Sequence, residues 1–138
     1  PGSWTARQVA DHIIKATDGI PDISTKPADR DPAEQVEAIR STFLDFTVKF
    51  ESPAFVVPGR GPFKVTETLS KLRRIKDHNI KIVLTRDLNE ICLGLALPGF
   101  GYLTRYEWLK FITFHTQRHT YQLKNIVNKI SMLEQVKN

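Results

Sequence analysis

A single cysteine, the lack of any long apolar run and the lack of repeats each exclude a class of protein. Cys92 has no partner for an internal disulfide, which fits a reducing compartment and predicts a cytoplasmic location. No apolar run approaches the ~20 residues of a membrane-spanning helix. The first residues also lack the charged and then apolar pattern of a signal peptide. We therefore expect a cytoplasmic protein that does not associate with membranes.

What remains is an ordinary globular composition, with 41% hydrophobic and 25% charged residues. A length of 138 residues suits one core, so we expect a single domain over residues 1–138. The net charge of +5 is modestly basic. The densest basic cluster lacks interleaved aromatic residues, which disfavours nucleic-acid binding and favours a solvated helix face. This cluster consists of Lys71, Arg73, Arg74 and Lys76.

Apolar residues recur at helical spacing in four segments, and turn-forming residues separate these segments. They span residues 5–18, 32–50, 66–85 and 105–133. Three of them begin with a capping pattern, in which a side chain near the start satisfies free backbone donors. The capping pairs are Thr5 with Gln8, Asp31 with Glu34, and Thr104 with Glu107. The sequence thus predicts an all-α four-helix bundle with two long ordered loops, 51–62 and 86–103.

The same spacing predicts which side chains of the middle two segments face the core. They are Val36, Ile39, Phe43, Phe46 and Phe50 in the second segment, and Leu69, Leu72, Ile75, Ile82 and Val83 in the third.

The second segment and the loop after it carry more apolar side chains than one inner face holds. Leu44 and Val48 lie on another side of the segment, and Phe55, Val56 and Val57 follow in the loop. So large an apolar surface predicts a homodimer. The alternative is that the two long loops fold over these residues.

Three of the four histidines are predicted to face inward. His115 and His119 lie four residues apart and therefore project from one side of the last segment. His12 faces inward on the first segment. Three buried imidazoles are unfavourable unless something satisfies them, and one shared divalent metal ion would do so. The alternative for any one inward histidine is an ordinary hydrogen-bonded core residue. His78 lies in a polar stretch and is predicted to be a surface residue.

The chain resembles the DinB-like superfamily in three places. These are the stretch from Trp4-Thr5 to His12, the segment Gly101-Tyr102-Leu103-Thr104-Arg105, and the segment His115-Thr-Gln-Arg-His119-Thr-Tyr-Gln122-Leu123. The resemblance implies a helical bundle in which His12, His115 and His119 hold one metal ion, with Gln122 supporting a ligand. It also implies a further helix before the first histidine helix. We expect that this helix is absent from the chain or that residues 32–50 fill its place.

The resemblance implies a metal-dependent enzyme acting on a small-molecule substrate, either a hydrolase or a transferase that uses a low-molecular-weight thiol. Three imidazoles leave a fourth coordination position for water or substrate, as in catalytic metal sites. Zinc or nickel is favoured, and iron or copper also suits imidazole. The alternative is a non-catalytic module, stabilised by a metal ion, that binds a partner. A protein side chain in the fourth position would favour that module.

Few other side chains are candidates for the chemistry. Glu107 is better explained as a helix cap, and Asp11 should point about 100° away from His12. Tyr121 is interpreted as a buried structural residue and Cys92 as a small buried hydrophobe. Catalytic residues other than the metal ligands therefore stay unassigned.

Overall fold

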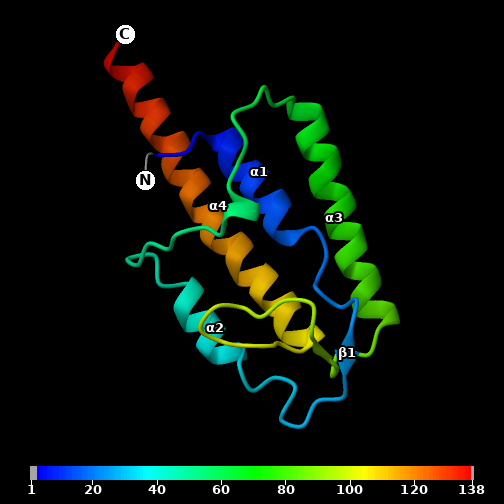
Figure 1. The fold of residues 1–138 in the computed structure, drawn as a ribbon. Helices are drawn as coiled ribbons and strands as arrows, with labels where there is room; N and C mark the ends of the chain where they lie inside the picture. The colour runs from blue at the N-terminus through cyan, green and yellow to red at the C-terminus, as the bar shows by residue number, and fades with distance from the viewer. Residues whose placement is uncertain (1–2, 138) are drawn as a thin grey trace.

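Four α-helices form the fold that this computed structural model describes over residues 3–137 (Figure 1). In chain order, the helices are α1 (Ala6–Thr17), α2 (Val36–Phe43), α3 (Val65–Thr85) and α4 (Arg105–Val136). A short 3₁₀ helix, η1 (Ala54–Val56), and two strands, β1 (Thr25–Lys26) and β2 (Ile91–Cys92), lie in the connections. The predicted all-α four-helix class is confirmed.

Side-chain caps start the two helices that carry the inward histidines. The Thr5 hydroxyl accepts a hydrogen bond from the Gln8 amide at 3.2 Å, and the Gln8 side chain accepts one from the Thr5 amide at 3.0 Å. The Thr104 hydroxyl accepts from the Glu107 amide at 3.1 Å. Such caps satisfy donors that a helix start leaves free, and both starts fall where the sequence predicts them.

The second helix is much shorter than predicted, and the expected span of 32–50 is wrong. Residues 32–35 form turns in place of α-helix, closed by backbone bonds from the Glu34 amide to the Asp31 carbonyl and from the Val36 amide to the Ala33 carbonyl. The helix ends at Phe43, and a local bond from the Thr47 amide to the Asp45 carboxylate follows. The Arg118 guanidinium donates to the carbonyls of Phe43, Asp45 and Val48, and turns and irregular backbone replace the predicted last turns of the helix.

The long helix α4 lies alongside both α1 and α2 (Figure 1). Helices α1 and α2 both pack on α4, and α3 packs on α1. The core fills the space between α2, the first half of α4 and the 86–103 loop. It contains Ile39, Cys92, Leu97, Leu103, Trp108, Phe111 and Phe114.

Several predicted inner positions are exposed. Ile75 and Ile82 of α3 are buried as expected, but Leu69 and Val83 are 46% and 50% exposed. Because α3 packs mainly on α1, only one stripe of its apolar residues is covered. Phe46 and Phe50 are also exposed, because the backbone that carries them is no longer helical.

The 86–103 loop is ordered by a small sheet and by ion pairs. Strand β2 pairs antiparallel with β1, with Thr25 opposite Cys92, a pairing that the sequence analysis did not predict. The buried Arg105 guanidinium contacts Asp22 at 3.0 Å and Glu90 at 2.9 Å, which ties this loop to the 19–30 connection.

No helix in the described part of the chain has the length and apolar content to cross a membrane.

Candidate metal centre

Three histidine side chains from two helices meet at one point beside α4. The Nε2 atom of His12, from α1, lies 3.1 Å from that of His115 and 3.0 Å from that of His119. The Nε2 atoms of His115 and His119 are 3.2 Å apart. His12 and His115 are buried and His119 is half-buried. The structure therefore brings together all three histidines that the sequence singles out, and the group could hold a metal ion.

Local folding explains why these rings converge. The spacing of four residues places His115 and His119 on one side of α4, one turn apart. Helix α1 buries Val9 and Ile13 as it packs on α4, and His12 lies on this same buried side. Apolar packing between the two helices thus fixes the distance between the rings.

Hydrogen bonds behind two of the rings determine which nitrogen faces the centre. The Nδ1 atom of His12 lies 2.8 Å from the carbonyl oxygen of Val56, an acceptor, so this nitrogen carries the proton. The Nδ1 atom of His119 lies 2.8 Å from the Gln122 side-chain oxygen and is protonated for the same reason. Gln122 therefore supports a ring from behind, as the sequence resemblance implies.

These tautomers leave an unfavourable contact at the centre that a cation would relieve. The Nε2 atoms of His12 and His119 are both unprotonated, so two lone pairs face each other at 3.0 Å with no hydrogen between them. Nitrogens that shared one tetrahedral zinc ion would lie ~3.3–3.4 Å apart, within a few tenths of an ångström of the 3.0–3.2 Å between these three atoms. The tautomers of His12 and His119 and the spacing of all three rings therefore fit a shared divalent ion.

Burial keeps the rings neutral. Desolvation, with a smaller effect of the neighbouring histidines, lowers the pKa of His115 to about 2. Desolvation likewise lowers the pKa of His119 to about 4, and it lowers the pKa of His12 against the opposing effect of the Val56 carbonyl. Only a neutral imidazole donates a lone pair to a metal, so all three rings are in the ligating form at neutral pH.

The depressed pKa values predict that the metal-free protein loses stability in mild acid. Unfolded histidine binds a proton near pH 6.5, whereas His115 and His119 do so only near pH 2 and pH 4 when folded. Stability is thus fully present above pH 6.5 and falls as the pH drops toward 4. Between pH 7 and pH 5 the expected loss is of the order of 2 kcal/mol for each of these rings. Urea unfolding of chelator-treated protein at both pH values measures it, and equal stabilities would contradict the prediction.

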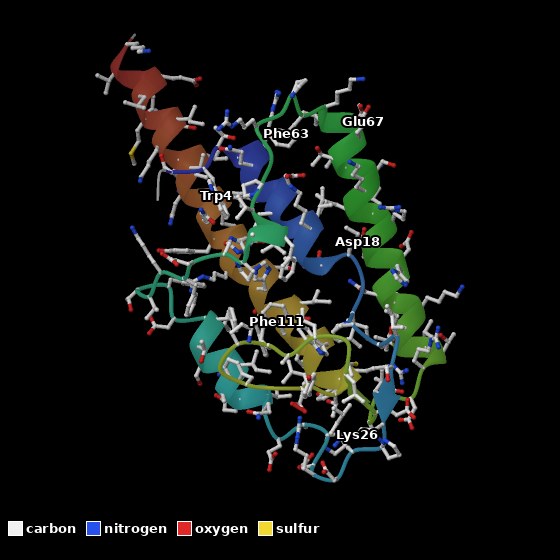
Figure 2. All side chains as sticks on the ribbon, viewed as in Figure 1. Trp4, Asp18, Lys26, Phe63, Glu67 and Phe111 are labelled. Atoms are coloured by element: carbon white, nitrogen blue, oxygen red, sulfur yellow. The ribbon has the colours of Figure 1, made fainter. Side chains whose placement is uncertain are left out.

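Aromatic side chains surround the centre. The ring centroids of Trp4 and His12 are 4.9 Å apart, and those of Phe111 and His115 are 5.3 Å apart. Figure 2 labels Trp4 and Phe111 beside α4. Arg118 donates to the carbonyls of the segment after α2 and lies over the ring of Phe50. It therefore fixes this segment next to α4 and is not free to contact a ligand.

The other candidate side chains have structural partners. The Glu107 amide donates to the Thr104 cap as expected, and its fully buried carboxylate also binds Arg30 at 2.6 Å. Asp11 points away from the centre, as expected, and accepts from the Gly59 amide. Tyr121 was expected to be buried but is 46% exposed and stacks on Phe46 at 4.3 Å.

Two remaining predictions for single residues are confirmed. Cys92 is fully buried, and desolvation raises the pKa of its thiol to about 12. His78 is exposed on α3. In the basic cluster of the same helix, Arg74 lies 3.6 Å from Asp18 and Lys76 lies 3.6 Å from Asp77, as on a solvated face.

Sequence reasoning missed the residues that act through their backbone or over a long range. Val56 contributes only its carbonyl oxygen to His12, and a backbone acceptor leaves no signal in residue type. Arg118 lies between the two histidines of α4, yet its partners are carbonyls 70 or more residues earlier in the chain. The sequence held one signal of the Val56 contact: Phe55, Val56 and Val57 are too apolar for a free linker, which indicates that this loop packs on the rest of the protein.

Comparison with known proteins gives an independent assignment. Searches of the curated proteins and of the solved structures found no match. The family model of the DinB superfamily matches residues 1–123. This match covers the capped first helix, its histidine and the paired histidines of α4. The chain belongs to the DinB superfamily.

Proposed function

We propose that the protein is a metal-dependent enzyme whose ion is held by His12, His115 and His119. The observation that carries the proposal is the meeting of three Nε2 atoms within 3.0–3.2 Å, two of them with their protons directed away. A buried arrangement of facing lone pairs is unfavourable in itself, which argues for a bound cation. Zinc or nickel is the favoured ion, with iron or copper next.

The residues of this chain hold and orient the centre. Val56 and Gln122 fix two ring tautomers, and burial keeps the three rings neutral. Trp4 and Phe111 exclude water from the rings that they contact, which strengthens electrostatic interactions at the centre. When bound, a divalent ion supplies Lewis-acid activation of water or of a thiol near neutral pH.

The proposed nucleophile comes from outside the chain. Cys92 is buried in the core with its pKa raised to about 12, so its thiol is not available as a thiolate. Glu107 and Asp11 are engaged with Arg30 and Gly59. The reaction classes that fit are hydrolysis by water and transfer to a low-molecular-weight thiol, each on a small-molecule substrate. The buried free thiol also supports the cytoplasm as the compartment.

Removal of the metal is expected to destabilise the protein, and this is the first test. An ion that binds only the folded state stabilises it by roughly 3 kcal/mol at a hundredfold excess over its dissociation constant. Elemental analysis of protein purified without a metal-affinity tag identifies the ion. Thermal unfolding with and without chelator then measures its contribution. An unchanged melting curve in protein that contains metal would overturn the proposal. The metal-loaded protein is then assayed for activity with low-molecular-weight thiols.

A non-catalytic module stabilised by metal is the second candidate. One observation favours it: a cavity of about 340 Å³ between α1 and the start of α3 includes Asp11 and Lys15 but none of the three histidines. A partner or ligand bound there would leave the metal with a structural role. Loaded protein that binds a ligand at this cavity and turns over neither hydrolysable substrates nor thiol acceptors would support the module over the enzyme.

Self-association is also expected. The segment around η1 and after α2 exposes large apolar side chains, and symmetric pairing is the commonest way to cover such a surface. These are Phe46, Val48, Phe50, Phe55 and Val57, each between 41% and 65% exposed. Sedimentation equilibrium at micromolar concentration should give twice the monomer mass of 15.8 kDa. A monomer mass would instead mean that this surface stays exposed to solvent.

A further inference from the structure

The segment from Val56, the last residue of η1, to Phe63 is held against one face of α1 by hydrogen bonds. Side chains at positions 7, 8, 11, 12 and 15 of α1 all form hydrogen bonds with this segment. We call this row of contacts the seam, and Figure 2 labels Phe63 at one end of it. The partners in the seam are Arg7 with Phe63, Gln8 and Asp11 with Gly59, His12 with Val56, and Lys15 with Val57.

The contact between His12 and Val56 is the one that reaches the metal centre. The Val56 residue is buried, and its carbonyl oxygen lies 2.8 Å from Nδ1 of His12. If the carbonyl moved away, His12 would lose the bond that keeps its proton on Nδ1. Its Nε2 atom would then be unprotonated for only part of the time. The position of this backbone carbonyl therefore controls a proposed ligand.

Asp11 holds the residues next to Val56. Its carboxylate accepts from the Gly59 amide at 2.9 Å and lies 3.1 Å from the Lys15 ammonium. Lys15 in turn donates to the Val57 carbonyl at 2.9 Å. One carboxylate thus anchors the backbone on both sides of Pro58.

The Asp11 anchor is stronger than its neighbours in the seam. Hydrogen bonds to an ionised carboxylate are about twice as strong as neutral ones, and the Asp11 side chain is only 18% exposed. The Gln8 contact to Gly59 is longer, at 3.4 Å, and the Arg7 contact to Phe63 is exposed. Removing the carboxylate would release Gly59 and loosen Lys15 together.

We propose that Asp11 is a positioning residue for the metal centre. It acts through the 57–59 backbone, which places the Val56 carbonyl behind His12 and so fixes the ring with Nε2 as the donor atom. The role in metal binding rests on the proposed function, but the effect on the His12 tautomer does not. Losing a group that supports a metal ligand weakens metal binding by about 10–100-fold, and the same range is expected here.

The test compares Asp11→Ala and Asp11→Asn with Asp77→Ala, which removes an exposed carboxylate that also pairs with a lysine. Nitrogen-15 NMR of the imidazoles in chelator-treated protein reports the tautomer of His12 without any metal. Titration with nickel, followed by its visible absorption bands, reports affinity and ligand geometry. Circular dichroism checks that each variant is folded.

In the unchanged protein and in Asp77→Ala, we expect His12 to carry its proton on Nδ1. Asp11→Ala should show a mixture of tautomers, about 10–100-fold weaker nickel binding and altered absorption bands. Asp11→Asn, whose amide oxygen still accepts from Gly59, should keep the tautomer and most of the affinity. It also serves as the folded variant if Asp11→Ala does not fold.

The two proposals fail in different ways. An unchanged His12 tautomer in Asp11→Ala overturns the positioning role, whatever the metal titration gives. A mixed tautomer in Asp11→Asn as well, despite its acceptor oxygen, also overturns the Gly59 contact as the cause. Failure of the unchanged protein to bind nickel or any other divalent ion, with the Nδ1 tautomer intact, overturns the metal function and leaves the positioning role standing.

Discussion

His115→Ala and His119→Ala should each lose most metal binding, with affinity reduced by more than ~100-fold, beyond the range seen for groups that only support a ligand. Each substitution removes one of three nitrogens that lie 3.0–3.2 Å apart, and no carboxylate or thiol is placed to replace it among the described residues. Titration with zinc and nickel, monitored by calorimetry, measures the loss.

The matched control is His78→Ala. His78 is exposed on α3 and does not belong to the cluster, so its loss should leave metal affinity and stability nearly unchanged. The metal-free forms of His115→Ala and His119→Ala should also lose less stability between pH 7 and pH 5 than the unchanged metal-free protein. The reason is that each has lost a ring whose protonation opposes folding. Equal metal loss in all three variants would mean that the ligand set is wrong.

The sequence predicted the parts of this fold that depend on local signals. The Thr5 and Thr104 caps mark the starts of α1 and α4, because a hydroxyl that bonds an amide three residues later is a local interaction. The spacing of His115 and His119 likewise determines their common face once the helix forms. With His12 on the buried side of α1, the cluster of three histidines that could hold a metal ion was predictable from residue type and spacing.

The parts that could not be predicted depend on contacts distant in sequence. Phe46 and Phe50 have helical spacing, but Arg118 binds the backbone carbonyls after α2, and these residues become exposed. Leu69 and Val83 have the spacing of inner positions, but only one side of α3 meets α1. A hydrophobic pattern states which residues are suited to burial, and tertiary packing decides which of them are covered.

Glu107 is the clearest case in which a local interpretation was incomplete. Its amide completes the Thr104 cap, as the pattern predicts. Its carboxylate, however, is fully buried and binds the Arg30 guanidinium at 2.6 Å and 3.2 Å. Nothing near Glu107 in sequence signals a partner 77 residues away. The pair joins the 19–35 connection to the start of α4, and removing one partner should be more damaging than removing one partner of a surface pair.

Arg30→Met should destabilise the protein by about 3–5 kcal/mol, since removing one partner of a buried ion pair leaves the other charge uncompensated. After the substitution, the only side chain among residues 3–137 left to donate to the Glu107 carboxylate is Thr104, whose hydroxyl also lies 2.6 Å from the Pro32 carbonyl. Typical domains have 5–15 kcal/mol of stability, so much of the total would be lost. Urea unfolding at pH 7 provides the measurement.

Two further variants show whether the buried charge is the cause. Arg40→Met breaks a pair with Glu37 in which both side chains are more than half exposed, and it should cost less than about 1 kcal/mol. The double variant Arg30→Met with Glu107→Met removes both charges and should recover most of the stability, because apolar replacements of a buried pair are often neutral or stabilising. If Arg30→Met were no more damaging than Arg40→Met, the pair would not hold the 19–35 connection. If the double variant were as unstable as the single one, the loss would come from Arg30's contacts with the carbonyls of Asp31 and Tyr102.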